Sequence, residues 1–208
     1  MKEKTLQKIE QLALGIIWGA IPVFSLFIAG WWLSIPFVPE SQIYIWALSG
    51  LLLGIVVDVI FLRRWVRKSY STRLWIWAAI YVYYAVGMFG FFMGFPLFHV
   101  LLAIPAGLYI GRVLIRSGAD RERMQKVARK LAIFTTAVLF VICLASAILA
   151  LINGNAAREL QGMFDLSFTV TNTVVVGIIL SGGTAMLVFG WWLTIATVKW
   201  MYSFSVQK

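Results

Sequence analysis

Two charged residues lie inside apolar stretches of the sequence, where an ionisable side chain can do chemistry. Asp58 follows the run "LSGLLLGIVV" and precedes the basic cluster that begins at Arg63. Arg112 lies at a similar distance before Arg116 on a later apolar stretch. A charge near the centre of a membrane-spanning helix costs about 2.5 to 3.5 kcal/mol, so such residues are usually paired or functional. We expect either an Asp58–Arg112 ion pair that joins two helices or a carboxylate that binds a coupling ion or proton.

The single histidine is a second candidate. His99 shares one helix face with Ala103, Gly107 and Gly111, because the four residues follow one another at four-residue steps. A lone histidine on an apolar helix is usually a hydrogen-bonded structural residue, but it titrates near neutral pH if it lines an aqueous vestibule. A metal centre would need carboxylate partners, and Cys143 is the only cysteine. We predict no metal site and no cofactor.

The sequence contains none of the short motifs that mark common catalytic sites. HExxH, GxSxG and the phosphate-binding GxxxxGK[ST] are absent, and no pair of intramembrane aspartates occurs. Any coupling to nucleotide hydrolysis would therefore require another chain. An enzymatic role is the less favoured interpretation.

The composition shows which elements must position these residues. The chain has 208 residues, of which 62% are hydrophobic and only 12% charged, with a mean hydropathy of +0.90. Several apolar runs are about 20 residues long, which matches a hydrocarbon core of roughly 30 Å. We predict an all-α, polytopic membrane protein. Its single integral membrane domain, residues 1–208, would be a bundle of six transmembrane helices at residues 12–34, 43–62, 74–92, 97–115, 131–152 and 173–198.

The placement of basic residues predicts the orientation of the bundle. Every lysine and arginine except Arg158 precedes the first span, separates the second from the third, ends or follows the fourth, or follows the sixth. Such residues are retained on the cytoplasmic side, so both termini are expected there, in an inner (cytoplasmic) or plasma membrane. Membrane lipids with anionic headgroups are the expected partners of these loops. The formal net charge of +10 then needs no nucleic-acid partner.

Two prolines fall about halfway along predicted spans. Pro22 in the first span and Pro105 in the fourth each follow the letters "AI", and each predicts a kink with a released carbonyl four residues earlier. The two spans would be equivalent in an inverted repeat of three-span halves, and interrupted helices at equivalent positions are typical of transporter binding sites. However, "GWWL" also occurs twice, in the first and sixth spans, which that scheme does not pair.

Small residues at four-residue steps predict faces on which helix backbones approach each other closely. Such residues are Gly15 and Gly19 in the first span and Gly50 and Gly54 in the second. In the fourth span they are Ala103, Gly107 and Gly111, and in the sixth Gly177, Ser181 and Ala185.

The segment 153–172 is too long for a simple turn and predicts a short interfacial helix. It would either cap an outward-facing vestibule or serve as a passive connector. The residues that we assign to this vestibule are His99, Trp31, Trp32, Arg158, Glu159 and Asp165.

Three classes of function fit these features. We favour a small-solute or ion transporter, or the solute-binding membrane subunit of one. In size, span number and basic loops the chain resembles the substrate-binding components of energy-coupling-factor transporters, although Gly15-x-x-x-Gly19 stands where that family has Ala-x-x-x-Ala. The alternatives are a structural or regulatory partner that packs on another membrane protein or on a second copy, and a membrane-embedded enzyme acting on a lipid. The scarcity of polar intramembrane groups argues against the enzyme.

Overall fold

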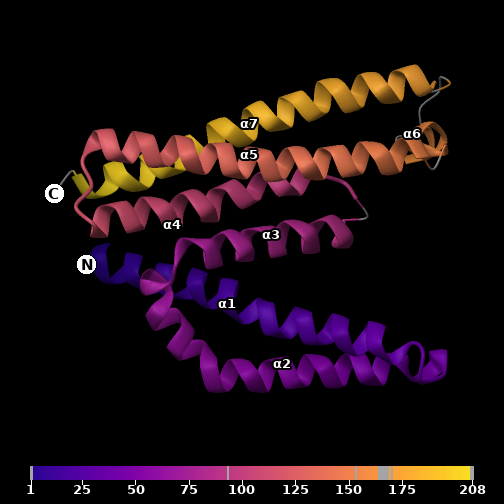
Figure 1. Ribbon diagram of the computed structural model, residues 1–208, viewed down its shortest axis with the longest axis horizontal. Coiled ribbons are helices and arrows are strands. Elements are labelled where there is room, and N and C mark those ends of the chain that lie inside the picture. Colours follow the sequence, from indigo (N-terminus) through magenta and orange to yellow (C-terminus); the bar gives the residue numbers. More distant parts are fainter. Residues whose placement is uncertain (1, 93, 153, 164–168, 170, 207–208) are drawn as a thin grey trace. The chain divides into compact units, whose positions relative to one another are not determined.

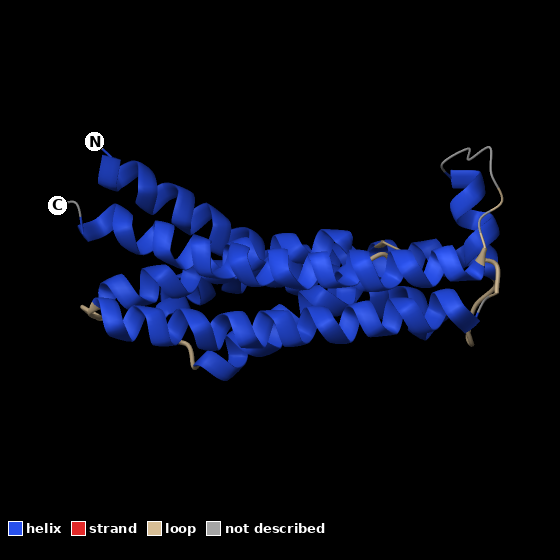
Figure 2. Ribbon diagram, turned by 90° about the horizontal axis from the view of Figure 1, so that it is seen from above, coloured by secondary structure: helices blue, strands red, loops and turns tan. Residues whose placement is uncertain are grey.

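The structure is a computed structural model that describes residues 2–92, 94–152, 154–163, 169 and 171–206. The described part is helical apart from short connections and contains no strand (Figure 2). Six of its helices are long and apolar enough to cross a membrane, which is the number of membrane-length helices that the sequence predicts. They are Glu10–Ser34, Glu40–Ser71, Leu74–Phe91, Leu97–Arg116, Arg121–Ile152 and Asn172–Ser203.

Large apolar side chains cover the outside of these helices. Val59 is 79% exposed, Leu180 66% and Val188 65%, and each belongs to a membrane-length helix. A soluble protein rarely exposes a continuous apolar surface of this kind, whereas lipid tails solvate it. The exposed surface therefore fits a multi-pass membrane protein.

The chain divides into two compact units, Met1–Arg73 and Leu74–Lys208. The first unit is a helical hairpin of α1 (Lys2–Ser34) and α2 (Glu40–Lys68), ended by the 3₁₀ turn η1 (Ser69–Ser71) (Figure 1). Pro39 caps the start of α2, where its missing N–H costs no hydrogen bond. The Ser34 carbonyl accepts hydrogen bonds from the backbone N–H groups of Phe37, at 2.9 Å, and Val38, at 3.1 Å.

Glycines bring the two helix backbones of the hairpin into direct contact. A Cβ atom added to Gly50 would lie 2.1 Å from the carbonyl oxygen of Leu26, and one added to Gly54 would lie 2.6 Å from the Cα of Val23. Gly30 meets the backbone of α2 in the same way, at 2.4 Å. Membrane helices gain stability from packing of this kind, because lipid tails are as apolar as the side chains they replace.

The second unit contains the other four membrane-length segments. In chain order its elements are α3 (Leu74–Phe91), η2 (Leu97–Leu102), α4 (Ala103–Arg116), α5 (Arg121–Ile152), α6 (Ala156–Met163) and α7 (Asn172–Val206). Helices α4 and α5 both pack along α7, and α3 packs on α5 and η2 (Figure 1). A short helix is present between the last two predicted spans, as α6, whereas its position at the membrane interface stays a prediction.

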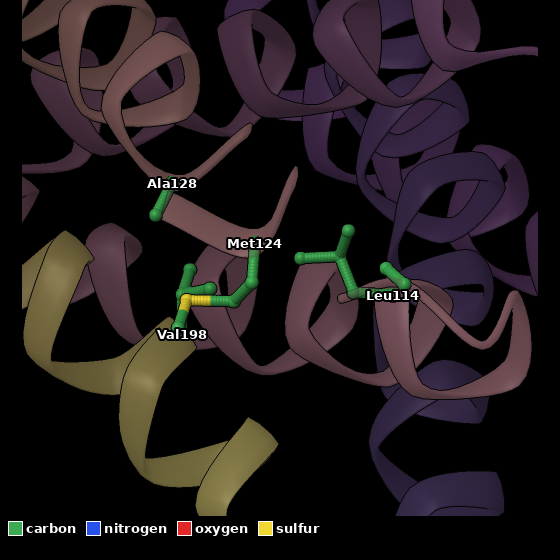
Figure 3. Close-up of a cluster of buried hydrophobic side chains, with 5 residues drawn as sticks. Leu114, Met124, Ala128 and Val198 are labelled. Carbon is green, nitrogen blue, oxygen red and sulfur yellow. The ribbon is translucent and has the colours of Figure 1, made fainter. Parts of the chain in front are cut away.

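A small apolar cluster joins α4, α5 and α7 near their basic ends. It consists of Leu114, Ala119, Met124, Ala128 and Val198, all at most 8% exposed (Figure 3). Tyr202 of α7 adds a hydrogen bond from its hydroxyl to the carbonyl of Ala119, at 2.6 Å. This packing extends the ordered bundle beyond the most apolar part of the spans.

In the turn between α4 and α5, a glycine ends α4 and an aspartate caps the start of α5. Gly118 adopts a φ of +62°, which glycine tolerates without strain, and Ala119 N–H donates to the Leu114 carbonyl at 3.1 Å. The Asp120 carboxylate then accepts from the backbone N–H of Arg123 at 3.0 Å. Helix α5 therefore begins at Arg121, ten residues before the predicted apolar span at 131.

The two prolines occupy different positions in their helices. Pro22 lies inside α1, which continues through it, and a bend there stays a prediction. Pro105 is the third residue of α4 and follows the 3₁₀ turn η2. A kink at Pro105 therefore also stays a prediction, because this proline lies in the first turn of α4. A proline in the first turn removes an N–H that has no intrahelical acceptor.

Candidate functional site

Asp58 lies on α2 where that helix faces α1. A Cβ atom added to Gly19 would lie 3.1 Å from Asp58 Oδ2 and 3.6 Å from Leu62 Cδ1, so the carboxylate lies directly on the α1 backbone. Its Oδ1 atom is buried and has no hydrogen-bond partner among the described residues. A buried carboxylate oxygen without a donor is costly, especially in a membrane-spanning segment. Asp58 is therefore the strongest candidate in the first unit for binding a proton or cation.

Arg112, the predicted partner of Asp58, lies in α4 and is half-buried. Helix α4 belongs to the second unit, whereas Asp58 belongs to the first. The Asp58–Arg112 ion pair therefore stays a prediction.

Polar contacts that the sequence analysis missed close the end of the hairpin where α1 begins. Trp18 Nε1–H donates to Ser69 Oγ at 2.8 Å, and the hydroxyl of Ser69 donates to the Trp65 carbonyl at 2.9 Å. The Tyr70 hydroxyl donates to the Glu10 carboxylate. These contacts join residues 51 and 60 positions apart, which no periodicity reveals. They hold η1, which follows the end of α2 that comes after Asp58, against α1.

His99 is buried in η2, only 2% exposed. Its Nε2 atom lies 2.8 Å from the carbonyl oxygen of Ala85 in α3, and its Nδ1 atom lies 3.2 Å from that of Pro96. The rings of His99 and Phe89 form a T-shaped pair, with their centroids 6.4 Å apart. These are the surroundings of the hydrogen-bonded structural histidine that the sequence analysis considered. The lining of an aqueous vestibule by His99 stays a prediction.

Threonines continue this polar region into α5 and α7. The hydroxyls of Thr135 and Thr194 lie 3.0 Å apart, and both side chains are at least 97% buried. The Thr136 hydroxyl is also buried and has no partner within the described part of the chain. A narrow gap with no space for a water molecule lies between Thr135 and Thr136 on one side and Tyr81 and His99 on the other.

We expect the Thr135–Thr194 hydrogen bond to contribute a small, measurable coupling between α5 and α7. Substituting each threonine by valine, singly and together, should give a coupling energy of about 0.6 kcal/mol and at most about 1.7 kcal/mol, the range of such bonds in membranes. The free energy of unfolding in mixed micelles measures it. Ser181→Ala is the control, because that exposed hydroxyl bonds only to the Gly177 carbonyl of its own helix. Strictly additive effects of the two valines would contradict the coupling.

The residues assigned to the outer vestibule come from several elements. Trp31 and Trp32 lie near the end of α1, 43% and 67% exposed, and Arg158 is exposed on α6. Glu159 lies in α6, but its side chain and all of Asp165 fall outside the described residues. Since the tryptophans belong to the first unit and His99 and Arg158 to the second, a shared vestibule stays a prediction.

The predicted small-residue faces divide into packed and open ones. On α4, a Cβ atom added to Gly107 would lie 2.8 Å from Thr197 Cβ, and one added to Gly111 would lie 2.8 Å from Met201 Cβ, so α7 lies directly against this face. Gly15 of α1 and Gly177 of α7 have no neighbouring atom within 4 Å in their units.

The described side chains include no group of three metal-ligating residues. No protein-family model matches the chain, and no curated protein or solved structure is similar to it.

Proposed function

We propose that this multi-pass membrane protein transports a small solute or ion, alone or as the solute-binding subunit of a larger transporter, with Asp58 as the coupling carboxylate. One observation carries the proposal: Asp58 Oδ1 is buried in a membrane-length hairpin and lacks a hydrogen-bond donor among the described residues. Ionisable groups in such positions usually mark ion or proton pathways.

A proton suits this site better than a metal ion. One carboxylate is enough to bind a proton, whereas Na⁺ or a divalent ion needs several oxygen ligands. Among the described residues, Asp58 belongs to no group of three metal-ligating side chains. Protonation also removes the charge, which lets the carboxyl group rest against the backbone at Gly19. The deprotonated carboxylate is charged and needs water or a cation beside it. The charged form therefore favours a site open to water, and the protonated form favours a closed one.

The basic residues support a cytoplasmic position for both termini. In the first unit they lie where α1 begins and α2 ends, and in the second where α4 ends, α5 begins and α7 ends. Lys126 forms an ion pair with Glu122 at 2.5 Å, and other exposed basic residues of α5 surround it. We propose that Arg129 and Lys130, next to the apolar part of α5, contact anionic headgroups.

The alternative function is that of a structural or regulatory partner of another membrane protein. The observation that favours it is the open face of α7, where Gly177 has no neighbour within 4 Å in its unit and Ser181 is exposed. Native mass spectrometry after gentle extraction from the host membrane separates the two functions. A retained small solute or an ATPase subunit supports transport, whereas a stoichiometric membrane-protein partner without solute supports the alternative.

Asp58→Asn should abolish proton-coupled uptake while leaving the fold intact. Asparagine keeps the shape of the side chain but cannot exchange a proton, so we expect at least a tenfold lower flux. Proteoliposomes with an enclosed pH-sensitive dye would be exposed to a pooled panel of amino acids, sugars, nucleosides and vitamins. Asp58→Glu should retain part of the flux.

The matched control is Glu122→Gln, which removes an exposed carboxylate of α5. Size-exclusion chromatography and circular dichroism report on folding. Unchanged uptake by folded Asp58→Asn, or loss of folded protein in this variant, would contradict the coupling role; the latter would leave Asp58 a structural residue.

A further inference from the structure

The two ring nitrogens of His99 both face carbonyl oxygens. Nε2 lies 2.8 Å from the Ala85 oxygen of α3, and Nδ1 lies 3.2 Å from the Pro96 oxygen at the start of η2. Carbonyl oxygens only accept hydrogen bonds. Both ring positions are therefore suited to N–H donors.

A neutral imidazole cannot satisfy both positions. It carries one N–H group, and its other nitrogen presents a lone pair. In this site the lone pair would point at a carbonyl oxygen, and the two would repel each other. The imidazolium ion has an N–H on each nitrogen and can donate to both carbonyls, with charge-assisted hydrogen bonds.

We propose that His99 is a proton-binding site that fastens η2 to α3. The bound proton gives the ring its second N–H, so that the imidazolium connects the Ala85 and Pro96 carbonyls. When the proton leaves, one of the two contacts is lost. The strength of this connection then depends on pH, and it does so in a unit that does not contain Asp58.

The groups around His99 fit a single protonated ring. From α3 it is approached by Tyr81, its only titratable neighbour along the gap, and from η2 by Val100. Helices α5 and α7 contribute threonines, Leu139 and Gly190, none of which titrates. The lining contains no second cation to repel the ring. Phe89 forms a T-shaped ring pair with His99, and the two carbonyl oxygens supply the negative charge density.

His99 lies near one end of its membrane-length segment. It is the third residue of the membrane-length segment Leu97–Arg116. At about 2 Å per residue in a 3₁₀ turn, its backbone lies within about 6 Å of the end of that segment.

Nitrogen NMR of the wild-type protein tests the proposal directly. Because His99 is the only histidine, ring-¹⁵N histidine labelling reports on this site alone. In lipid bilayers at about pH 6 we expect both nitrogens to carry hydrogen, and at about pH 8.5 one of them to lose it. A single neutral tautomer over this whole range would overturn the proposal.

A stability measurement gives an independent readout. A fold that binds the proton better than the unfolded chain loses stability as pH rises through the titration. The thermal midpoint of the wild type, relative to that of His99→Gln, should therefore fall as pH rises. Glutamine can still donate one hydrogen bond but does not titrate. A pH-independent difference between the two proteins would overturn the proposal, and if His99→Gln does not fold, the NMR titration decides.

Discussion

Alanine in place of Gly50 is expected to force α1 and α2 apart and to destabilise the first unit by about 3 kcal/mol or more. The added Cβ would lie 2.1 Å from the Leu26 carbonyl oxygen and 2.8 Å from its carbon, which are backbone atoms that cannot rotate away. Only a shift of one helix relieves the overlap, and such a shift also separates Gly54 from Val23. The free energy of unfolding in mixed micelles, followed by circular dichroism, measures the loss.

Gly15→Ala is the matched control on the same hairpin. No atom of the unit lies within 4 Å of the Cβ position at Gly15. Alanine also favours a helix over glycine by about 1 kcal/mol, so this variant should be as stable as the wild type or slightly more stable. Equal effects of the two alanines would show that the hairpin does not depend on backbone contact at Gly50.

Valine at Gly107 is expected to separate α4 from α7 and to lower the stability of the second unit by about 3 kcal/mol. Its Cβ would lie 2.8 Å from Thr197 Cβ and 3.2 Å from the Thr194 carbonyl oxygen, and its methyl groups would add further overlap. Thr197 is itself 92% buried, so its side chain has little room to move. Unfolding in mixed micelles and resistance to limited proteolysis are the measurements.

The control for this variant is Gly177→Val on α7, where the Cβ position has no neighbour within 4 Å in its unit. It should unfold with the same midpoint as the wild type. A stable Gly107→Val protein would mean that α4 can move away from α7 without loss of packing energy.

The membrane-length helices could be predicted from the length of their apolar runs, because a run of about 20 apolar residues matches the thickness of the hydrocarbon core. Several helices extend beyond the predicted apolar spans: α1 begins at Lys2 rather than near Leu12, and α5 begins at Arg121 rather than near Leu131. By hydropathy, the basic segment before Leu131 lies outside the fifth span. The segment is nevertheless helical: Asp120 caps its start, and Met124 and Ala128 pack against Val198, some 70 residues later in the chain. Contacts at that separation leave no local periodic signal.

Pro105 shows why the position of a proline within a span does not determine its effect. The apolar run begins at Leu97, so Pro105 reads as a mid-span residue. In the structure the chain from Leu97 to Leu102 forms a 3₁₀ turn, and the α-helix starts only at Ala103. The proline is then a helix-starting residue, which the hydropathy pattern cannot distinguish from a kink.

The candidate sites differ in how far the sequence indicates them. Asp58 stands out because it interrupts an apolar run at the step set by Gly50 and Gly54. The Thr135–Thr194 contact does not, since intramembrane hydroxyls commonly bond within their own helix, as Thr194 also does to Gly190. Only the packing of α5 on α7 brings the two hydroxyls together.

The glycine contacts also set an order for assembly during synthesis. Helices α1 and α2 are consecutive and meet through their own backbones, so their hairpin can close as soon as both have entered the bilayer. Gly107 and Gly111, in contrast, wait for Thr197 and Met201, which the ribosome adds 90 residues later. Until α7 is inserted, α4 presents an unfilled face to the membrane. The nascent chain is therefore most exposed to wrong partners between its fourth and last spans.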